Sequence, residues 1–197
     1  VNTISIFTLK NQSLKIINDS NNQSITLSQS MAIMKFIDSI SNNTKHSLFS
    51  TDPIKQAKII EIAEIHNSYI QPVQGVTFCE NLQSHATNFS NQEIQNFVQE
   101  HCYRGMKASE ELIGFDCDDR SGGPKFCVGN EYSAADLFLY AMVVNCVTRH
   151  GMDIKEFPKI KKVMDSMMNE DFVKRAHPLV QVDADDPAEC RWQKWPY

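Results

Sequence analysis

The sequence has no excess of basic residues and no long apolar run. Its 19 lysines and arginines face 24 aspartates and glutamates, which gives a net charge of −5. A chain with this charge builds no positive field, so no nucleic-acid partner is expected. The longest apolar run, Leu137 to Val144, is far shorter than the roughly 18–20 residues of a membrane span, and no transmembrane segment is predicted.

Signatures of metal sites and of a disulfide framework are also missing. The six cysteines include no C-x-x-C pair, and the chain has no H-E-x-x-H sequence, so no metal site is predicted. Cys117 and Cys127 are close enough in sequence for a disulfide, but free thiols in a reducing compartment explain the cysteines better. The start at Val1 carries no basic and apolar leader, and we expect a cytoplasmic or mitochondrial protein.

The opening residues predict a small β-rich unit. Apolar or alternating runs at 4–7, 14–17 and 24–27 predict two or three strands, with a hairpin between the last two. Ser28 or Ser30 is the expected N-cap of the helix that follows. Four apolar residues recur there at helical spacing: Met31, Met34, Ile37 and Ile40.

The rest of the chain predicts a bundle of helices. Asp52-Pro53 is a helix start, and Ser90 with Glu93 has the spacing of a capping box, as Ser133 with Asp136 does. Pro72 should kink or end the first helix, and Pro158 should open a later one. The helix after Ser133 is apolar on every side and should lie at the centre. One face of the first helix is predicted to be core: Ile59, Ile62, Ala63, His66, Tyr69 and Ile70.

Several segments together resemble one known family. They are Gln29-Ser30 followed by Met-Ala-Ile-Met-Lys-Phe-Ile, Ile70-Gln-Pro-Val-Gln74, Val128-Gly-Asn-Glu-Tyr-Ser-Ala-Ala-Asp136, Arg149-His-Gly-Met-Asp153 and His177-Pro-Leu-Val-Gln-Val-Asp-Ala184. Spread over residues 24 to 187, they resemble motifs of the zeta class of glutathione transferases, the maleylacetoacetate isomerases. The resemblance implies a mainly α fold, in which an all-helical glutathione-transferase C-terminal bundle follows a truncated thioredoxin-like β/α unit. Residues 1–41 would form that partial domain, 42–51 a linker and 52–197 the helical domain.

The resemblance also implies site residues. A carboxamide and a hydroxyl at a helix start would bind the γ-glutamyl carboxylate of glutathione, so Gln29 and Ser30 are the candidate cofactor-binding residues, with an ordinary helix cap as the alternative. Arg149 would face the carboxylates of the substrate, with an exposed arginine at a helix end as the alternative. Ser133 and Asp136 are expected to be a structural cap and not a catalytic pair.

The catalytic part of the family pattern is not found. The Ser or Cys motif that activates the glutathione thiolate is absent, so no catalytic residue is assigned, and Gln12 stands where the family has a cis-proline. Two hypotheses follow. The chain is a degenerate, non-catalytic structural or interaction subunit of a larger assembly, which Gln12 favours, or it is an active glutathione-dependent maleylacetoacetate cis–trans isomerase or transferase. Glutathione is the cofactor only in the second, and a homodimer or a multi-protein complex is the expected assembly.

Overall fold

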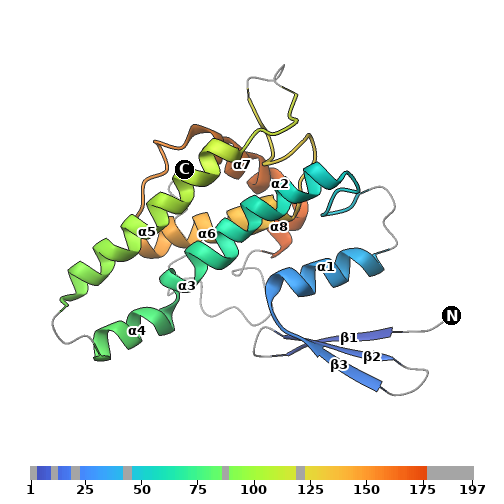
Figure 1. The fold of residues 1–197 in the computed structure, drawn as a ribbon, viewed down its shortest axis with the longest axis horizontal. Helices are drawn as coiled ribbons and strands as arrows, with labels where there is room; N and C mark the ends of the chain where they lie inside the picture. Colours follow the sequence, from blue (N-terminus) through green and yellow to red (C-terminus); the bar gives the residue numbers. More distant parts are fainter. Residues whose placement is uncertain are drawn as a thin grey trace. The chain divides into compact units, whose positions relative to one another are not determined.

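The computed structural model describes residues 4–9, 13–18, 23–41, 46–85, 89–118 and 123–176. The chain divides into two compact units, Val1–Phe49 and Ser50–Tyr197, which are treated separately below (Figure 1). Gln12 and the segment from His177 to Ala184, both singled out in the sequence, lie outside the described residues.

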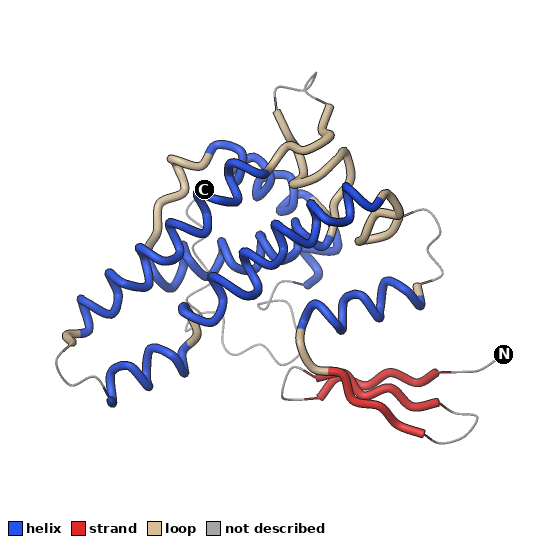
Figure 2. Tube along the Cα trace, in the orientation of Figure 1, coloured by secondary structure: helices blue, strands red, loops and turns tan. Residues whose placement is uncertain are grey.

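The first unit is a three-stranded antiparallel sheet followed by one helix (Figure 2). Its strands β1 (Ile4–Leu9), β2 (Ser13–Asn18) and β3 (Gln23–Leu27) pair in the order β1-β2-β3, and Ile16 lies opposite Ile25. The predicted hairpin between the last two strands is confirmed. The helix α1 spans Ser30–Ile40.

The segment after α1 is bound back onto the first unit. Asp38 of α1 accepts hydrogen bonds from the backbone N–H of Leu48 at 2.8 Å and from the hydroxyl of Ser47 at 2.7 Å. The ammonium of Lys35 lies 4.8 Å from the ring centre of Phe49, a cation–π contact. Phe49 is buried, as are Leu14 and Ile16 of β2. These contacts hold the segment 47–49 against α1, and the buried hydrophobic side chains described for the unit come from β2 and Phe49.

Within its described ranges, the regular elements of the second unit are all helices, joined by loops. An isolated bridge pairs Phe115 with Val128. Its elements are α2 (Pro53–Glu64), the π-helix η1 (Ile65–Ile70), α3 (Gln71–Gln74), α4 (Val76–His85), α5 (Asn91–Leu112), α6 (Ala134–His150), α7 (Pro158–Asn169) and α8 (Asp171–Ala176). The mainly α fold predicted from the sequence is therefore confirmed. Among the described residues, no helix is both long and apolar enough to span a membrane.

The predicted helix starts are found where the local signals place them. The Asp52 carboxylate accepts from the N–H groups of Ile54 and Lys55, and Pro53 occupies the first turn. Ser90 and Glu93 form the predicted capping box of α5. Each of these caps satisfies backbone donors that the helix itself cannot pair.

The π-helix η1 changes which side chains the first long helix buries. The N–H of Gln71 donates to the carbonyl of His66, five residues earlier. A π turn holds more residues than an α turn, so the 3.6-residue spacing used in the sequence no longer predicts the buried face. Ile70 is fully buried, but the prediction that Tyr69 belongs to the core is wrong, because Tyr69 is 40% exposed and stacks on His101. The helix ends at Gln74, two residues beyond Pro72.

The helix α6 is the centre of the second unit. It packs against α2, η1, α5 and α7, and most of its length is buried, as its uniformly apolar sequence predicts.

The helices η1 and α5 approach each other closely at Gly105, where a Cβ atom would lie 2.5 Å from Cγ1 of Ile70. Only a glycine allows the two helices to approach this closely. All four apolar residues predicted for α7 are buried: Ile160, Val163, Met164 and Met167.

Candidate functional site

The start of α1 in the first unit holds two of the predicted site residues. The N-cap is Gln29, so the expectation that Ser28 or Ser30 caps this helix is wrong. Gln29 has φ 76° and ψ 121°, and its side chain makes no capping hydrogen bond. A non-glycine residue in this region of backbone space costs about 1–3 kcal/mol, and such residues concentrate at ligand sites.

The strained backbone of Gln29 leaves the first turn of α1 open. Gln29, Ser30 and Ala32 are exposed, no acidic residue lies in the first turn, and no side chain in the described part of the chain caps it. The free N–H groups and the helix dipole favour an anion there. The hydroxyl of Ser30 and the carboxamide of Gln29 can add hydrogen bonds, so the arrangement suits one carboxylate group.

Other helices of the protein already have a carboxylate at this position. Asp52, Glu93 and Asp136 serve α2, α5 and α6 from within the local sequence. The start of α7 is served from another helix, because Glu110 of α5 accepts from the N–H groups of Lys159 and Ile160 at 2.9 Å each. The residues around Pro158 do not indicate that Glu110, 48 residues earlier, accepts from the N–H groups of this helix start. At the start of α1 the described residues supply no such carboxylate.

Arg149, the predicted substrate residue, belongs to the second unit. It is exposed in the last turn of α6, and its positive charge acts on the Cys79 thiol of α4. Burial raises the pKa of Cys79, and the nearby Arg149 guanidinium opposes that rise in part. No ion pair or hydrogen bond of Arg149 is found with the described parts of the chain. A guanidinium in that setting can bind a carboxylate through two parallel hydrogen bonds.

A buried polar group lies near the end of α6. Gln74, which is 3% exposed, donates from Nε2 to the Met142 sulfur at 2.8 Å and accepts from the Cys146 thiol at 3.5 Å. The carbonyl of His150 accepts from the carboxamides of Gln95 and Gln99. These bonds fix the end of α6, and with it the backbone of Arg149, against α3 and α5. Apart from Arg149, only Gln74 and His150 among these residues lie in the family-like motifs of the sequence.

Ser133 and Asp136 lie together, buried, at the start of α6. Asp136 Oδ2 accepts from the N–H and the hydroxyl of Ser133 at 2.8 Å each, and Oδ1 accepts from the N–H of Cys127 at 2.7 Å. Burial raises the pKa of Asp136, and these hydrogen bonds oppose the rise. Both carboxylate oxygens therefore accept from the backbone or from the capping serine, which is the arrangement of a helix cap.

The remaining candidates carry no ligand-binding arrangement. His66 is fully buried in η1, and its Nε2 lies 3.0 Å from the hydroxyl of Ser109. Cys117 and Cys127 are not joined in a disulfide, and the Cys117 thiol donates to the carbonyl of Gly129 at 3.0 Å. Within the described ranges, no three His, Cys, Asp or Glu residues are grouped so that they could hold a metal ion.

Comparison with known proteins agrees with this arrangement of helices. The family model described as glutathione S-transferase, C-terminal domain, matches residues 78–175. Over these residues the chain is similar to the C-terminal domain of glutathione S-transferases. It is 32% identical over 158 residues to the probable maleylacetoacetate isomerase 1 of Drosophila melanogaster, an alignment that covers 80% of this chain and 58% of the relative. A glutathione S-transferase of zeta class from Euphorbia esula is 27% identical over 161 residues, covering 82% of this chain and 67% of the relative.

The fold of this chain is shared with solved structures. A maleylacetoacetate isomerase from Anaeromyxobacter dehalogenans, with dicarboxyethyl glutathione and citrate bound in its active site, superposes with a TM-score of 0.76. The match covers 90% of this chain and 74% of that one at 24% identity. The resemblance to zeta-class transferases predicted from the motifs is therefore confirmed. The chain spans a little under three fifths of the length of its Drosophila relative.

Proposed function

We propose that this protein binds glutathione and uses it as a zeta-class transferase does, with the γ-glutamyl carboxylate held at the start of α1. The observation that carries the proposal is the backbone of Gln29. Its left-handed φ of 76° is unfavourable for glutamine and supplies no cap to the helix. A bound carboxylate that accepts from the N–H groups of the first turn would offset the energy of this unfavourable conformation.

The proposed roles of the residues follow from their chemistry. The hydroxyl of Ser30 donates to the carboxylate together with the backbone N–H groups of the first turn, and the carboxamide of Gln29 orients the ligand. Bound glutathione supplies the thiolate that adds to a cis double bond, permits rotation about the resulting single bond and then leaves. No residue described here is assigned to activation of that thiol.

We further propose that the substrate is a cis-unsaturated acid of the maleylacetoacetate type. The relatives named maleylacetoacetate isomerase support this, as does the dicarboxyethyl glutathione held by the Anaeromyxobacter protein. In this chain Arg149 is the proposed partner of a substrate carboxylate. Its exposed guanidinium, on a helix end anchored by buried hydrogen bonds, has the charge and planar shape for that contact.

The test is a comparison of two serine variants of the same helix. Ser30→Ala should weaken glutathione binding about tenfold to a hundredfold in calorimetric titration, because it removes one hydrogen bond to a charged group. Ser39→Ala, also on α1, is the matched control. Ser39 is exposed and its hydroxyl donates to the carbonyl of Phe36, so this variant should bind as the unchanged protein does. Equal affinities for the two variants would reject the proposed carboxylate site.

A second candidate function is a non-catalytic subunit of a larger assembly. The observation in its favour is the absence of any proline before Pro53, with Gln12 at the position of the family's cis-proline. Native size measurement and an isomerase assay on the protein from its own cells distinguish the two functions. A large complex with no glutathione binding at millimolar concentration supports the subunit, and an active free homodimer rejects it.

A further inference from the structure

We draw no further inference here: the strongest candidate, the exposed stack of rings formed by Tyr69 of η1, His101 and Phe97 of α5 and Phe78 of α4, is an unpartnered apolar face, and nothing in the structure shows what covers it.

Discussion

His66 is held in a setting that its charged form cannot tolerate. Its ring is fully buried among helices, and burial lowers its pKa from 6.5 to about 3. Below about pH 6.5 the His66 ring is therefore protonated in the unfolded chain, whereas in the folded chain it stays neutral until about pH 3. Stability contributed by the neutral ring is fully present above pH 6.5 and is lost as the pH falls through that window.

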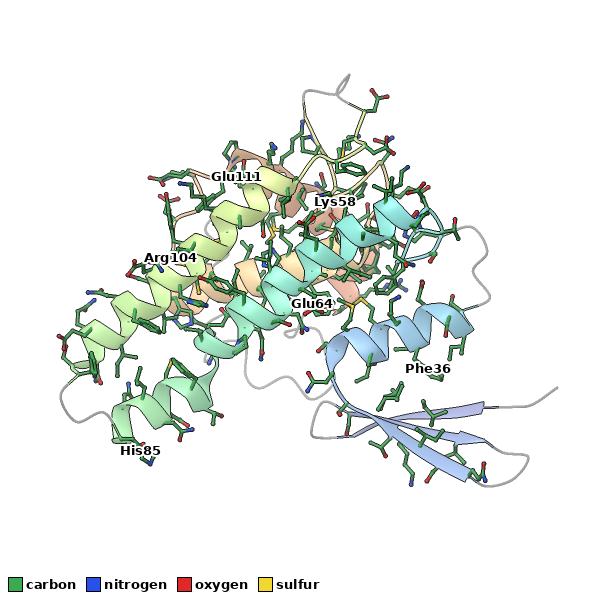
Figure 3. All side chains as sticks on the ribbon, viewed as in Figure 1. Phe36, Lys58, Glu64, His85, Arg104 and Glu111 are labelled. Atoms are coloured by element: carbon green, nitrogen blue, oxygen red, sulfur yellow. The ribbon has the colours of Figure 1, made fainter. Side chains whose placement is uncertain are left out.

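This linkage gives a measurable slope. Between pH 7.5 and pH 5 the free energy of unfolding should fall by about 2 kcal/mol on account of His66 alone. Chemical denaturation of His66→Gln across the same range should show a slope smaller by that amount, whatever its absolute stability. The control is His85→Gln, at the exposed end of α4 (Figure 3), which should keep the slope of the unchanged protein. An identical slope in His66→Gln would show that other groups cause the acid sensitivity.

Gly105 is the residue whose size sets the spacing of η1 and α5. Alanine is the better helix former by roughly 1 kcal/mol, yet Gly105→Ala should destabilise the protein by about 1–3 kcal/mol because its Cβ would overlap Ile70. In the background of Ile70→Ala, which removes the two Ile70 atoms nearest to that Cβ, the same change should cost less. Thermal unfolding of the four proteins in this double-mutant cycle measures the coupling, and additive effects would contradict the proposed overlap.

At the scale of helices, the carboxylate caps differ in value according to burial. Asp136 is fully buried and accepts from Ser133 and Cys127, whereas Asp52 is exposed. Asp136→Ala leaves several buried donors unpaired and should cost about 3 kcal/mol or more, while Asp52→Ala should cost about 1 kcal/mol. Denaturant titration of the two variants provides the comparison. Equal losses would mean that the buried hydrogen bonds of Asp136 add nothing to its cap.

The sequence predicts the elements whose cause is local. Asp52-Pro53 and Ser90 with Glu93 place helix starts because a cap acts over three or four residues. It could not predict Glu110 at the start of α7, which comes from another helix, or the π turn that moves Tyr69 out of the core. At α1 the spacing of apolar residues predicts the helix, but the serines suggested the wrong cap, because capping preferences do not predict the φ of 76° at Gln29, the residue that precedes the helix.

At the scale of the whole molecule, the two units differ in the size of their cores. Among the residues of the first unit whose side-chain burial is described (13–17, 23–41 and 46–49), the buried hydrophobic ones are Leu14, Ile16 and Phe49, whereas every long helix from α5 to α7 in the second unit contributes several. Burial of apolar surface is the main source of stability, so the first unit should open more readily.

Native-state hydrogen exchange tests this difference directly. Backbone amides of β2 and β3 should exchange with an opening free energy at least about 2 kcal/mol below that of amides in α5 and α6. Excess glutathione should slow exchange in the first unit selectively if the ligand binds at α1, since a ligand stabilises the state that binds it. Uniform protection across the two units would show that they open together.

The family-like motifs of the sequence identify the candidate site residues, but they do not predict the structural properties of those residues. The sequence predicts Gln29, Ser30 and Arg149 as site residues because their surroundings resemble motifs of a known family, not because their spacing implies chemistry. The two properties that give them meaning, an uncapped first turn and an exposed guanidinium on an anchored helix end, depend on backbone angles and tertiary hydrogen bonds. Neither property can be predicted from a short segment of the sequence.

The left-handed backbone of Gln29 has a consequence for engineering this fold. A screen that rewards only heat resistance should accumulate glycine at position 29, because glycine adopts that geometry without penalty. Variants enriched in this way would survive higher temperatures and yet lose the carboxamide beside the open helix end. Selection for thermal stability and selection for the proposed ligand contact would then favour different residues at position 29.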